Sequence, residues 1–404
     1  MEWLFLLLPV AAASGWWAAR RSQARPRSTP LPPAPAFFRG LNYLLNEQPD
    51  KALDVFLKLA EVDRETAETH LALGALFRRR GEVDRAIRVH QDLIARPNLS
   101  PAQRGFAVYE LGRDYLRAGL FDRAERLFNE LVEMKIQRRA ALRALIEIYQ
   151  QEKDWERCID TARQLEVVTG EPMRVEIAQF HCELAEQCLR AQESERARVH
   201  LSAARAADAD CIRASLLQAE MDMARGDARS ALELYRRCAE RGPRYVPALL
   251  PCLLACYRQL GYTEVADELL QLFRAYPSPP LMLQLSEVLE RERGSAAALE
   301  FLAGYLRERA DLAGAARLLE LRARLAGTQP DATDALLLEV LHHLRAMQPA
   351  YQCDRCGFEA RALHWQCPSC KQWGSIKAVE PQVMPPALPA CPRAPLDAAS
   401  GPRA

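Results

Sequence analysis

Apolar residues recur along this chain with a helical spacing, and fourteen paired positions, twelve of them small, recur among them. A step of twelve residues leads from the first position of each pair to the second, and the second positions lie 34, 38, 34, 39, 34 and 35 residues apart. Two antiparallel helices approach closely only where small side chains meet. The pattern therefore predicts seven stacked helical hairpins. The paired positions are Gly40 and Ala52, Gly74 and Ala86, Gly112 and Ala124, Ile146 and Cys158, Ala185 and Ala197, Ala219 and Ala231, and Leu254 and Ala266.

Large side chains flank the small positions. Large residues follow three positions after the first small residue or four after the second, as at Tyr43, Phe77, Tyr115, Phe56, Phe128 and Tyr235. Together with Gly-containing turns at 81–84, 119–122 and 226–227, this arrangement resembles the tetratricopeptide repeat. We expect an all-α tetratricopeptide-repeat superhelix over 37–348, with one or two degenerate repeats after Ala266.

The first helices of such an array line a concave groove. Projection along these helices from Gly74 and Gly112 predicts a partly basic surface, formed by Arg78, Arg79, Arg113, Arg117 and Arg258. A charge run on a helix is more often a solvated face than a binding site. The sequence leaves both interpretations open, a solvated face or a site for an acidic partner.

The N-terminus has the features of a membrane anchor. Residues 3–19 carry no charge, and 17 residues span roughly 25 Å as a helix, close to the ~30 Å hydrocarbon core. Trp3, Trp16 and Trp17 mark the two ends, and the arginines follow the apolar run rather than precede it. We predict a single-pass transmembrane helix over 1–20, with the N-terminus outside and the bulk of the chain cytoplasmic. A cleaved signal peptide, with a small-residue site at 11–13, and a buried core helix are the alternatives.

Two Pro-rich segments flank the folded part. Residues 21–36 are basic and Pro-rich, which predicts an extended linker. Residues 378–404 are rich in Pro and Ala, which predicts a disordered tail.

The chain has no global charge that would attract nucleic acid. It contains 54 basic and 53 acidic residues, a formal net charge of +1. The phosphate-binding, nucleophile-elbow, zinc-protease and dinucleotide motifs are also missing from its sequence. We therefore expect no nucleic-acid partner and no enzymatic activity.

Four of the twelve cysteines form the most specific chemical signal in the chain. Cys353, Cys356, Cys367 and Cys370 make two C-x-x-C turns separated by ten residues. Two such turns provide a closed tetrahedral set of four thiolates, which is typical of a structural metal site. We predict one zinc ion in a ribbon over 349–377, with iron as the alternative because both turns resemble those of rubredoxin. The eight single cysteines are expected to be reduced packing residues.

The ribbon is too short to be stable through its own core. Phe358, Trp365, Trp373 and Ile376 are therefore expected to need the metal to complete the unit.

The order of these parts, with the segments MEWLFLLLPVAAA, LFRRRGEVDRAIRVHQDLI, ELGRDYLRAGLFDRAERLF, YQCDRCGF and HWQCPSC, resembles the lipopolysaccharide assembly protein B family over residues 1–377. The resemblance implies a Gram-negative inner-membrane protein with a periplasmic N-terminus, acting as an adaptor with the membrane protease FtsH. Its implied client is the deacetylase LpxC, so that proteolysis regulates lipopolysaccharide assembly. Whether the chain forms a homo-oligomer stays open.

The Pro-rich linker, the degenerate last repeats and the Pro-rich tail depart from what we expect of the family. Two other functions stay open beside the adaptor. One is an iron electron-transfer protein on a repeat scaffold, and the other is a generic tetratricopeptide peptide-binding module, which would be periplasmic or secreted if the N-terminal segment were removed.

Overall fold

The structure is a computed structural model that describes residues 35–46, 48–62, 67–326 and 332–379. The predicted anchor, nearly all of the linker and the tail from residue 380 lie outside these ranges. Within them, no helix combines the length and the apolar character needed to cross a membrane. The chain divides into two compact units, residues 1–148 and 149–404, which are described separately.

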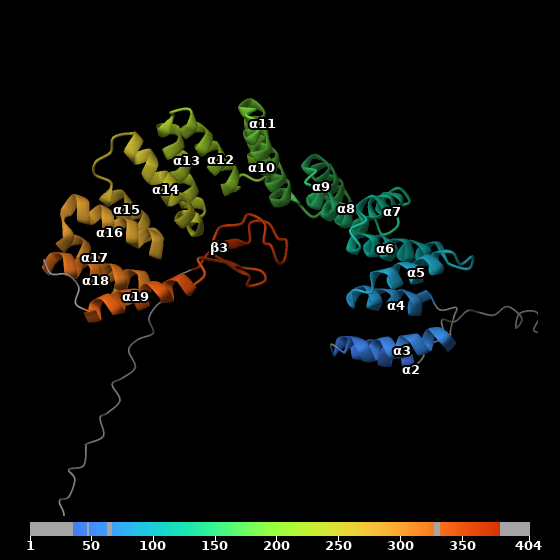
Figure 1. The fold of residues 1–404 in the computed structure, drawn as a ribbon. Coiled ribbons are helices and arrows are strands. Elements are labelled where there is room, and N and C mark those ends of the chain that lie inside the picture. The colour runs from blue at the N-terminus through green and yellow to red at the C-terminus, as the bar shows by residue number, and fades with distance from the viewer. Residues whose placement is uncertain (1–34, 47, 63–66, 327–331, 380–404) are drawn as a thin grey trace, which may run out of the picture. The chain divides into compact units, whose positions relative to one another are not determined.

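The repeats are built from consecutive α-helices (Figure 1). Those that begin in the first unit are α2 (Pro35–Leu45), α3 (Pro49–Val62), α4 (Ala67–Arg79), α5 (Val83–Ile94), α6 (Pro101–Arg117), α7 (Phe121–Glu133) and α8 (Arg138–Glu152). Those of the second unit are α9 (Trp155–Thr169), α10 (Arg174–Arg190), α11 (Ser194–Ala207), α12 (Ile212–Ala224), α13 (Ala228–Arg241), α14 (Val246–Gln259), α15 (Ala266–Ala275), α16 (Pro279–Arg293), α17 (Ser295–Glu308), α18 (Leu312–Ala326) and α19 (Ala332–Met347). A short 3₁₀ helix, η2 (Pro243–Tyr245), precedes α14.

The small positions are buried as the spacing predicted. The second member of every pair, from Ala52 to Ala266, is at most 1% exposed. In three hairpins of the first unit the first member is a glycine, and a ring of the second helix lies where its Cβ would be. A Cβ on Gly40 would lie 2.7 Å from Phe56, and one on Gly112 would lie 2.6 Å from Phe128. The hairpins therefore close by fitting a large ring into the space of a missing side chain.

In the second hairpin this ring belongs to a histidine. A Cβ on Gly74 would lie 2.4 Å from the ring of His90, which is fully buried. A buried polar ring needs a hydrogen-bond partner, and the His90 Nδ1 lies 2.5 Å from a carboxylate oxygen of Asp114 on α6. The repeat pattern therefore predicted the position, but the residue there adds a polar contact to the next repeat.

The irregular region after Ala266 also forms helical hairpins. Helices α16 and α17 pack together, as do α18 and α19, and the last of these ends at Met347. Two further hairpins therefore follow Ala266 and α15 in the described part of the chain. Most of the single cysteines in the described part of the chain are buried, as expected of packing residues: Cys158, Cys182, Cys188, Cys211, Cys238 and Cys256.

The four cysteines of the two C-x-x-C turns lie in and beside a small sheet that follows α19 (red in Figure 1). Its strands are β1 (Tyr351–Cys353), β2 (Glu359–Ala360) and β3 (Ile376–Ala378). All pairings are antiparallel, in the order β2-β1-β3, with Tyr351 opposite Ala360 on one side and opposite Ala378 on the other. We call residues 349–379 the knuckle. The all-α repeat array with a small C-terminal ribbon is thus as predicted.

Candidate metal centre

The knuckle holds its cysteines on two turns of the same design. The first turn is closed by the Gly357 N–H, which donates to the Cys353 carbonyl at 3.0 Å. The second is closed by the Lys371 N–H, which donates to the Cys367 carbonyl at 2.9 Å. Both donor residues have left-handed backbones, with φ of 76° at Gly357 and 59° at Lys371. Each turn therefore brings its two sulfurs to the same side of the chain.

The four sulfurs are spaced for one metal ion. The Sγ atoms of Cys353 and Cys370 lie 3.7 Å apart, as do those of Cys356 and Cys367, and all four lie within 4.8 Å of one another. A tetrahedron with Zn–S bonds of about 2.3 Å has S–S edges of roughly 3.8 Å. The donor set is also the all-thiolate set typical of structural zinc or rubredoxin iron. The residues therefore fit a tetrahedral metal ion, but the geometry does not decide between zinc and iron.

The protonation of the thiols shows why a cation suits this site. Burial alone raises the pKa of Cys353, but its hydrogen bond with Ser375 and hydrogen bonds from the N–H groups of Cys356 and Arg355 lower it to about 6. The Gln372 N–H lowers the pKa of Cys370, yet burial and the three neighbouring sulfurs raise it to about 11. Four sulfurs this close do not all ionise together unless a cation balances their charge.

The knuckle is docked on the helices of its own unit through a tryptophan. Trp373 is 6% exposed and meets Trp155 and Phe180 edge-on, with ring centroids 6.1 and 6.0 Å apart. Its indole N–H donates to the Gln150 side-chain oxygen at 3.0 Å, and the Gln366 amide donates to the same oxygen at 2.9 Å. Aromatic pairs of this geometry contribute about 0.5–1.5 kcal/mol each beyond the area they bury.

A buried arginine lies beneath the knuckle. Arg213 of α12 places its guanidinium 6.0 Å from the Trp373 ring centroid and 5.8 Å from that of Trp365. The same guanidinium binds Glu183 and Glu186 of α10 at 2.7 and 2.6 Å. Burial lowers the pKa of Arg213, but the two carboxylates outweigh it and the pKa is raised. Arg213 therefore stays charged and joins two repeat helices to the rings of the knuckle.

A third set of contacts lies at η2. Tyr245 stacks on Trp365 with centroids 5.6 Å apart, and its hydroxyl donates to the Gly374 carbonyl at 3.3 Å. Arg244 donates to both carboxylate oxygens of Asp354, at 2.9 and 3.1 Å, and to the Ala378 carbonyl at 3.2 Å. The knuckle is thus attached to several repeat helices at once.

Comparison with known proteins agrees with this architecture. A family model described as the rubredoxin metal binding domain matches residues 351–378, and one described as the PPR repeat matches 113–136. Lipopolysaccharide assembly protein B of Escherichia coli K12 is 38% identical over 388 residues, which cover 94% of this chain and 98% of that protein. The chain belongs to the lipopolysaccharide assembly protein B family.

The family assignment extends to a second organism. Lipopolysaccharide assembly protein B of Haemophilus influenzae is 34% identical over 397 residues, covering 95% of this chain and 99% of that protein. Among solved structures, a tetratricopeptide repeat protein of Parabacteroides merdae is 12% identical over 76% of this chain and 97% of its own, with a TM-score of 0.31. The rubredoxin metal binding domain model covers all four cysteines that the sequence analysis singled out.

The four apolar residues named from the sequence divide between two environments. Trp365 and Trp373, which we expected to need the metal to complete the unit, pack on Tyr245, Trp155 and Phe180 of the helices. Of the four apolar residues named from the sequence, Phe358 and Ile376 are the two that pack beside the buried cysteines. The physical reason is size, because a three-stranded sheet of this length has no interior that could enclose two indole rings.

The predicted groove arginines differ in their surroundings. Arg78 is 12% exposed and binds Glu110 and Asp114 of α6 at 2.5 and 2.7 Å, so two carboxylates neutralise its charge. Arg79 and Arg117 are exposed. Arg113 lines a cavity in the first unit, and Arg258 lines another, between α14 and α16 in the second unit. Sequence projection did not reveal the carboxylates opposite Arg78, although Glu110 and Asp114 lie one repeat further along the chain.

Proposed function

We propose that this protein is an inner-membrane adaptor that regulates lipopolysaccharide assembly by promoting FtsH-dependent proteolysis of LpxC. The observation that supports the proposal most strongly is the combination of relatives named for lipopolysaccharide assembly with a four-cysteine knuckle docked on the repeats. Residues 1–20 would anchor the chain, with the N-terminus periplasmic and the repeats cytoplasmic. The repeats would bind protein partners, and Arg79, Arg113, Arg117 and Arg258 are proposed to contribute to that surface.

In this mechanism the protein positions other proteins and needs no catalytic residue. A bound zinc ion would supply a closed crosslink between the two turns, held by Cys353, Cys356, Cys367 and Cys370. The contacts of Trp373 with Phe180 and Arg213 would then hold the knuckle on the repeat helices of the second unit. Tethering to the membrane raises the effective concentration of a client near a membrane protease, up to about millimolar for a short linker.

The test follows the lifetime of LpxC in cells whose own copy of this protein is depleted. Wild-type protein is expected to restore rapid turnover and to co-purify with FtsH. The Cys367→Ser/Cys370→Ser variant should lengthen the LpxC half-life, because loss of the thiolates releases the knuckle. An unchanged half-life after depletion of the wild type would contradict the proposal.

A matched experiment tests the anchor. A chain that begins after residue 21 is compared with the full chain for membrane fractionation and for LpxC turnover. The truncated chain is expected to be soluble and to leave LpxC long-lived, and it should regain function when fused to an unrelated single-pass helix. Rapid turnover with the unanchored chain would show that tethering is not required.

One observation favours the electron-transfer alternative. Cys356 and Cys370 are exposed, which is the arrangement that an iron centre needs to exchange electrons with a partner. Metal analysis and the visible spectrum of protein purified from its own cells separate the two. Zinc and a colourless protein support the adaptor, whereas iron with a reversible reduction would support electron transfer.

A further inference from the structure

Two cysteines outside the metal centre lie side by side within the second unit. Cys182 is part of α10, Cys211 directly precedes α12, and their Sγ atoms are 3.8 Å apart. Both thiols are free, and the two residues are 0% and 4% exposed. A disulfide bond is about 2.05 Å long, so the sulfurs need to approach by roughly 1.8 Å to form one. A small local shift is therefore enough to join them.

The backbone indicates which of the two residues can make that shift. Cys182 lies in the middle of α10, a helix of 17 residues. Cys211 ends the short turn before α12, in which its N–H donates to the Asp208 carbonyl at 3.1 Å. Connecting turns move more readily than packed helices. We therefore expect Cys211 to move toward Cys182 when the two sulfurs bond.

A cavity gives small molecules access to Cys211. It has a volume of about 300 Å³ and lies where α10, η2 and the knuckle meet, with Cys211, Gln179 and Trp365 in its lining, together with the exposed Arg241. About 10–15 Å³ of free volume holds one water molecule, so the space admits hydrogen peroxide as well. Cys182, by contrast, is fully buried. Cys211 is therefore the thiol that a small oxidant reaches first.

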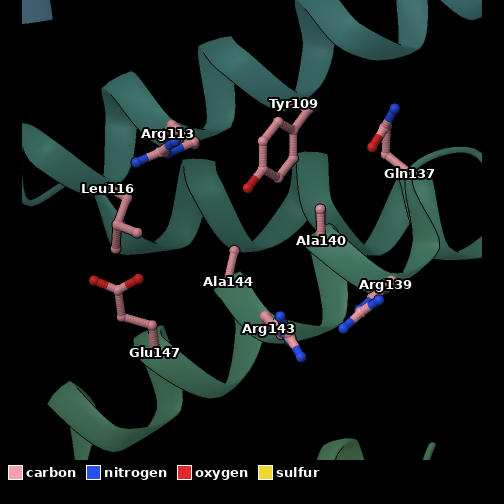
Figure 2. A pocket seen from close by; sticks show the side chains of 9 residues that line it. All are labelled: Tyr109, Arg113, Leu116, Gln137, Arg139, Ala140, Arg143, Ala144 and Glu147. Carbon is pink, nitrogen blue, oxygen red and sulfur yellow. The ribbon is translucent and has the colours of Figure 1, made fainter. Parts of the chain in front are cut away.

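The first unit provides an internal reference for this chemistry. Its own cavity, between α6 and α8, is lined by nine residues that contain no sulfur atom (Figure 2). All twelve cysteines of the chain follow residue 149 in the sequence. An oxidant that acts on thiols should therefore leave the first unit unchanged.

The surroundings also favour ionisation of one thiol over the other. The hydrogen bond with Cys182 lowers the pKa of Cys211, burial raises it, and the Ala214 N–H lowers it again, so the pKa lies below the ordinary value for cysteine. The same hydrogen bond and burial raise the pKa of Cys182. Because the thiolate is the nucleophilic form, Cys211 is also the more reactive of the two.

The pair lies beside the contact that supports the knuckle. Arg213 follows Cys211 by two residues and binds Glu183, the residue after Cys182, at 2.7 Å. The Gln179 amide nitrogen lies 3.8 Å from the Cys211 sulfur, and the Gln179 side-chain oxygen accepts from Arg213 at 3.3 Å. A disulfide would join residues 29 positions apart and crosslink α10 to α12 at this point.

We propose that Cys182 and Cys211 are a peroxide-sensitive pair whose reversible disulfide crosslinks α10 to α12 beneath the knuckle. The Cys211 thiolate attacks a peroxide oxygen, so that an S–O bond forms, the O–O bond breaks and hydroxide leaves, which gives a sulfenic acid. Cys182 then attacks the Cys211 sulfur, the S–O bond breaks, and the oxygen leaves as water with the Cys182 proton. Two thiols and one hydrogen peroxide thus give one disulfide and two waters, and a dithiol reverses the reaction by exchange.

Intracellular disulfides of this kind are usually transient and redox-sensing. The inference goes beyond the adaptor function and does not depend on it.

The experiment treats the full, metal-loaded chain in detergent with hydrogen peroxide, at doses that leave its metal content unchanged. Free thiols are then blocked with N-ethylmaleimide, and the chain is digested without reduction. Mass spectrometry is expected to find the peptides of Cys182 and Cys211 joined, and to find them separate after dithiothreitol. Cys238→Ser is the matched control, because Cys238 lines a smaller cavity together with Cys211 and is the rival partner. It should leave the crosslink unchanged.

Two single variants test the order of attack. Cys182→Ser removes the second thiol, so the sulfenic acid at Cys211 should persist and react with dimedone several-fold more than in the wild type. Cys211→Ser should leave Cys182 unoxidised at the same dose. Cys158, which is buried elsewhere in the second unit, should stay unlabelled in both variants. Labelling confined to Cys211 therefore distinguishes a reactive thiol from an unfolded chain.

Hydrogen exchange tests the crosslink itself after the metal has been chelated. Exchange in α10 and α12 should be about tenfold slower, or more, in the oxidised than in the reduced protein, because a disulfide restricts the unfolded chain. Helices α4 and α6 of the first unit should not change. Cys182→Ser/Cys211→Ser, treated with the same peroxide, should show no slowing.

Three results would overturn the inference. The first is a disulfide between Cys182 and Cys211 that is absent at every dose below the one that releases the metal. The second is a bond from Cys211 to Cys238 in its place. The third is exchange in α10 and α12 that is equal or faster in the oxidised protein.

Discussion

Each of the two units contains an arginine with little solvent exposure that joins the first helices of neighbouring repeats. Arg78 reaches from α4 to Glu110 and Asp114 on α6, and Arg213 reaches from α12 back to two glutamates on α10. The side chains are 12% and 4% exposed. The same kind of contact, a guanidinium between two carboxylates, therefore occurs in both units.

The two arginines differ in what surrounds the ion pair. Around Arg78 the contact is completed by His90, which belongs to the hairpin between the two helices. Around Arg213 it is completed by Trp365 and Trp373, which come from the knuckle. The Arg78 contact involves only residues of the repeats, whereas the Arg213 contact binds a segment that is distant in the sequence. The comparison teaches that an ion pair between neighbouring repeats becomes a docking site when side chains from another part of the chain pack over it.

Loss of the metal should produce the largest difference in stability between the region around Arg213 and the region around Arg78. A structural zinc ion contributes apparent binding energies of about 10–16 kcal/mol in small peptides, so chelation is expected to unfold the knuckle and expose the surface around Arg213. Hydrogen exchange should then accelerate in α10 and α12, while α4 and α6 keep their protection. Unchanged exchange in α10 and α12 after metal removal would show that the knuckle does not stabilise them.

Shortening the docked tryptophan should weaken only the second unit. Trp373→Ala is expected to destabilise it by about 3–5 kcal/mol, because a large buried side chain is lost. Trp373→Phe keeps most of the packing but loses the N–H hydrogen bond to Gln150, which should destabilise the second unit by about 1 kcal/mol. Denaturant unfolding followed by hydrogen exchange in each unit measures both effects. Equal losses for the two variants would contradict the packing argument.

Replacing each arginine by methionine tests the difference in burial of the partners. Arg78→Met leaves Asp114, which is 0% exposed, without its cation, and should destabilise the first unit by about 3 kcal/mol. Arg213→Met leaves Glu183 and Glu186 without their cation. These side chains are 20% and 32% exposed and can be hydrated, so the variant should destabilise the second unit by only about 1–2 kcal/mol.

The two methionine variants are compared by hydrogen exchange within each unit. Adding Asp114→Asn to Arg78→Met should recover part of the loss, since an uncharged amide is less costly to leave buried. A larger effect for Arg213→Met than for Arg78→Met would reverse the proposed order.

The smallest effects are expected at the glycines. Gly74→Ala would place a Cβ 2.4 Å from the His90 ring that supports the Arg78 network, and should destabilise the first unit by about 1–3 kcal/mol. Gly304, in the middle of α17, has open space within 4 Å of the position that a Cβ would take, so Gly304→Ala should stabilise by about 0.5–1 kcal/mol. Thermal unfolding of the two variants, which carry the same chemical change, should therefore shift in opposite directions.

The sequence predicted most of the local architecture. Pairs such as Gly112 and Ala124 lie twelve residues apart on two helices that pack directly, so their spacing predicts the hairpin and its repeat. The two C-x-x-C turns are likewise short and self-contained, and the sequence identified all four sulfurs that the structure brings together. Contacts of this kind are visible in a sequence because short separations constrain them.

The sequence by itself determined the repeat period, the close helix crossings and the four-sulfur cage. Only the tertiary structure decided that Arg78 is neutralised across repeats and that Trp373 is docked on Gln150, a residue 223 positions away in the chain. Helical periodicity specifies which face of a helix is buried, but it carries no information about which distant segment covers that face. The knuckle packs on the repeats because burial of its tryptophans requires more apolar surface than a three-stranded sheet can provide.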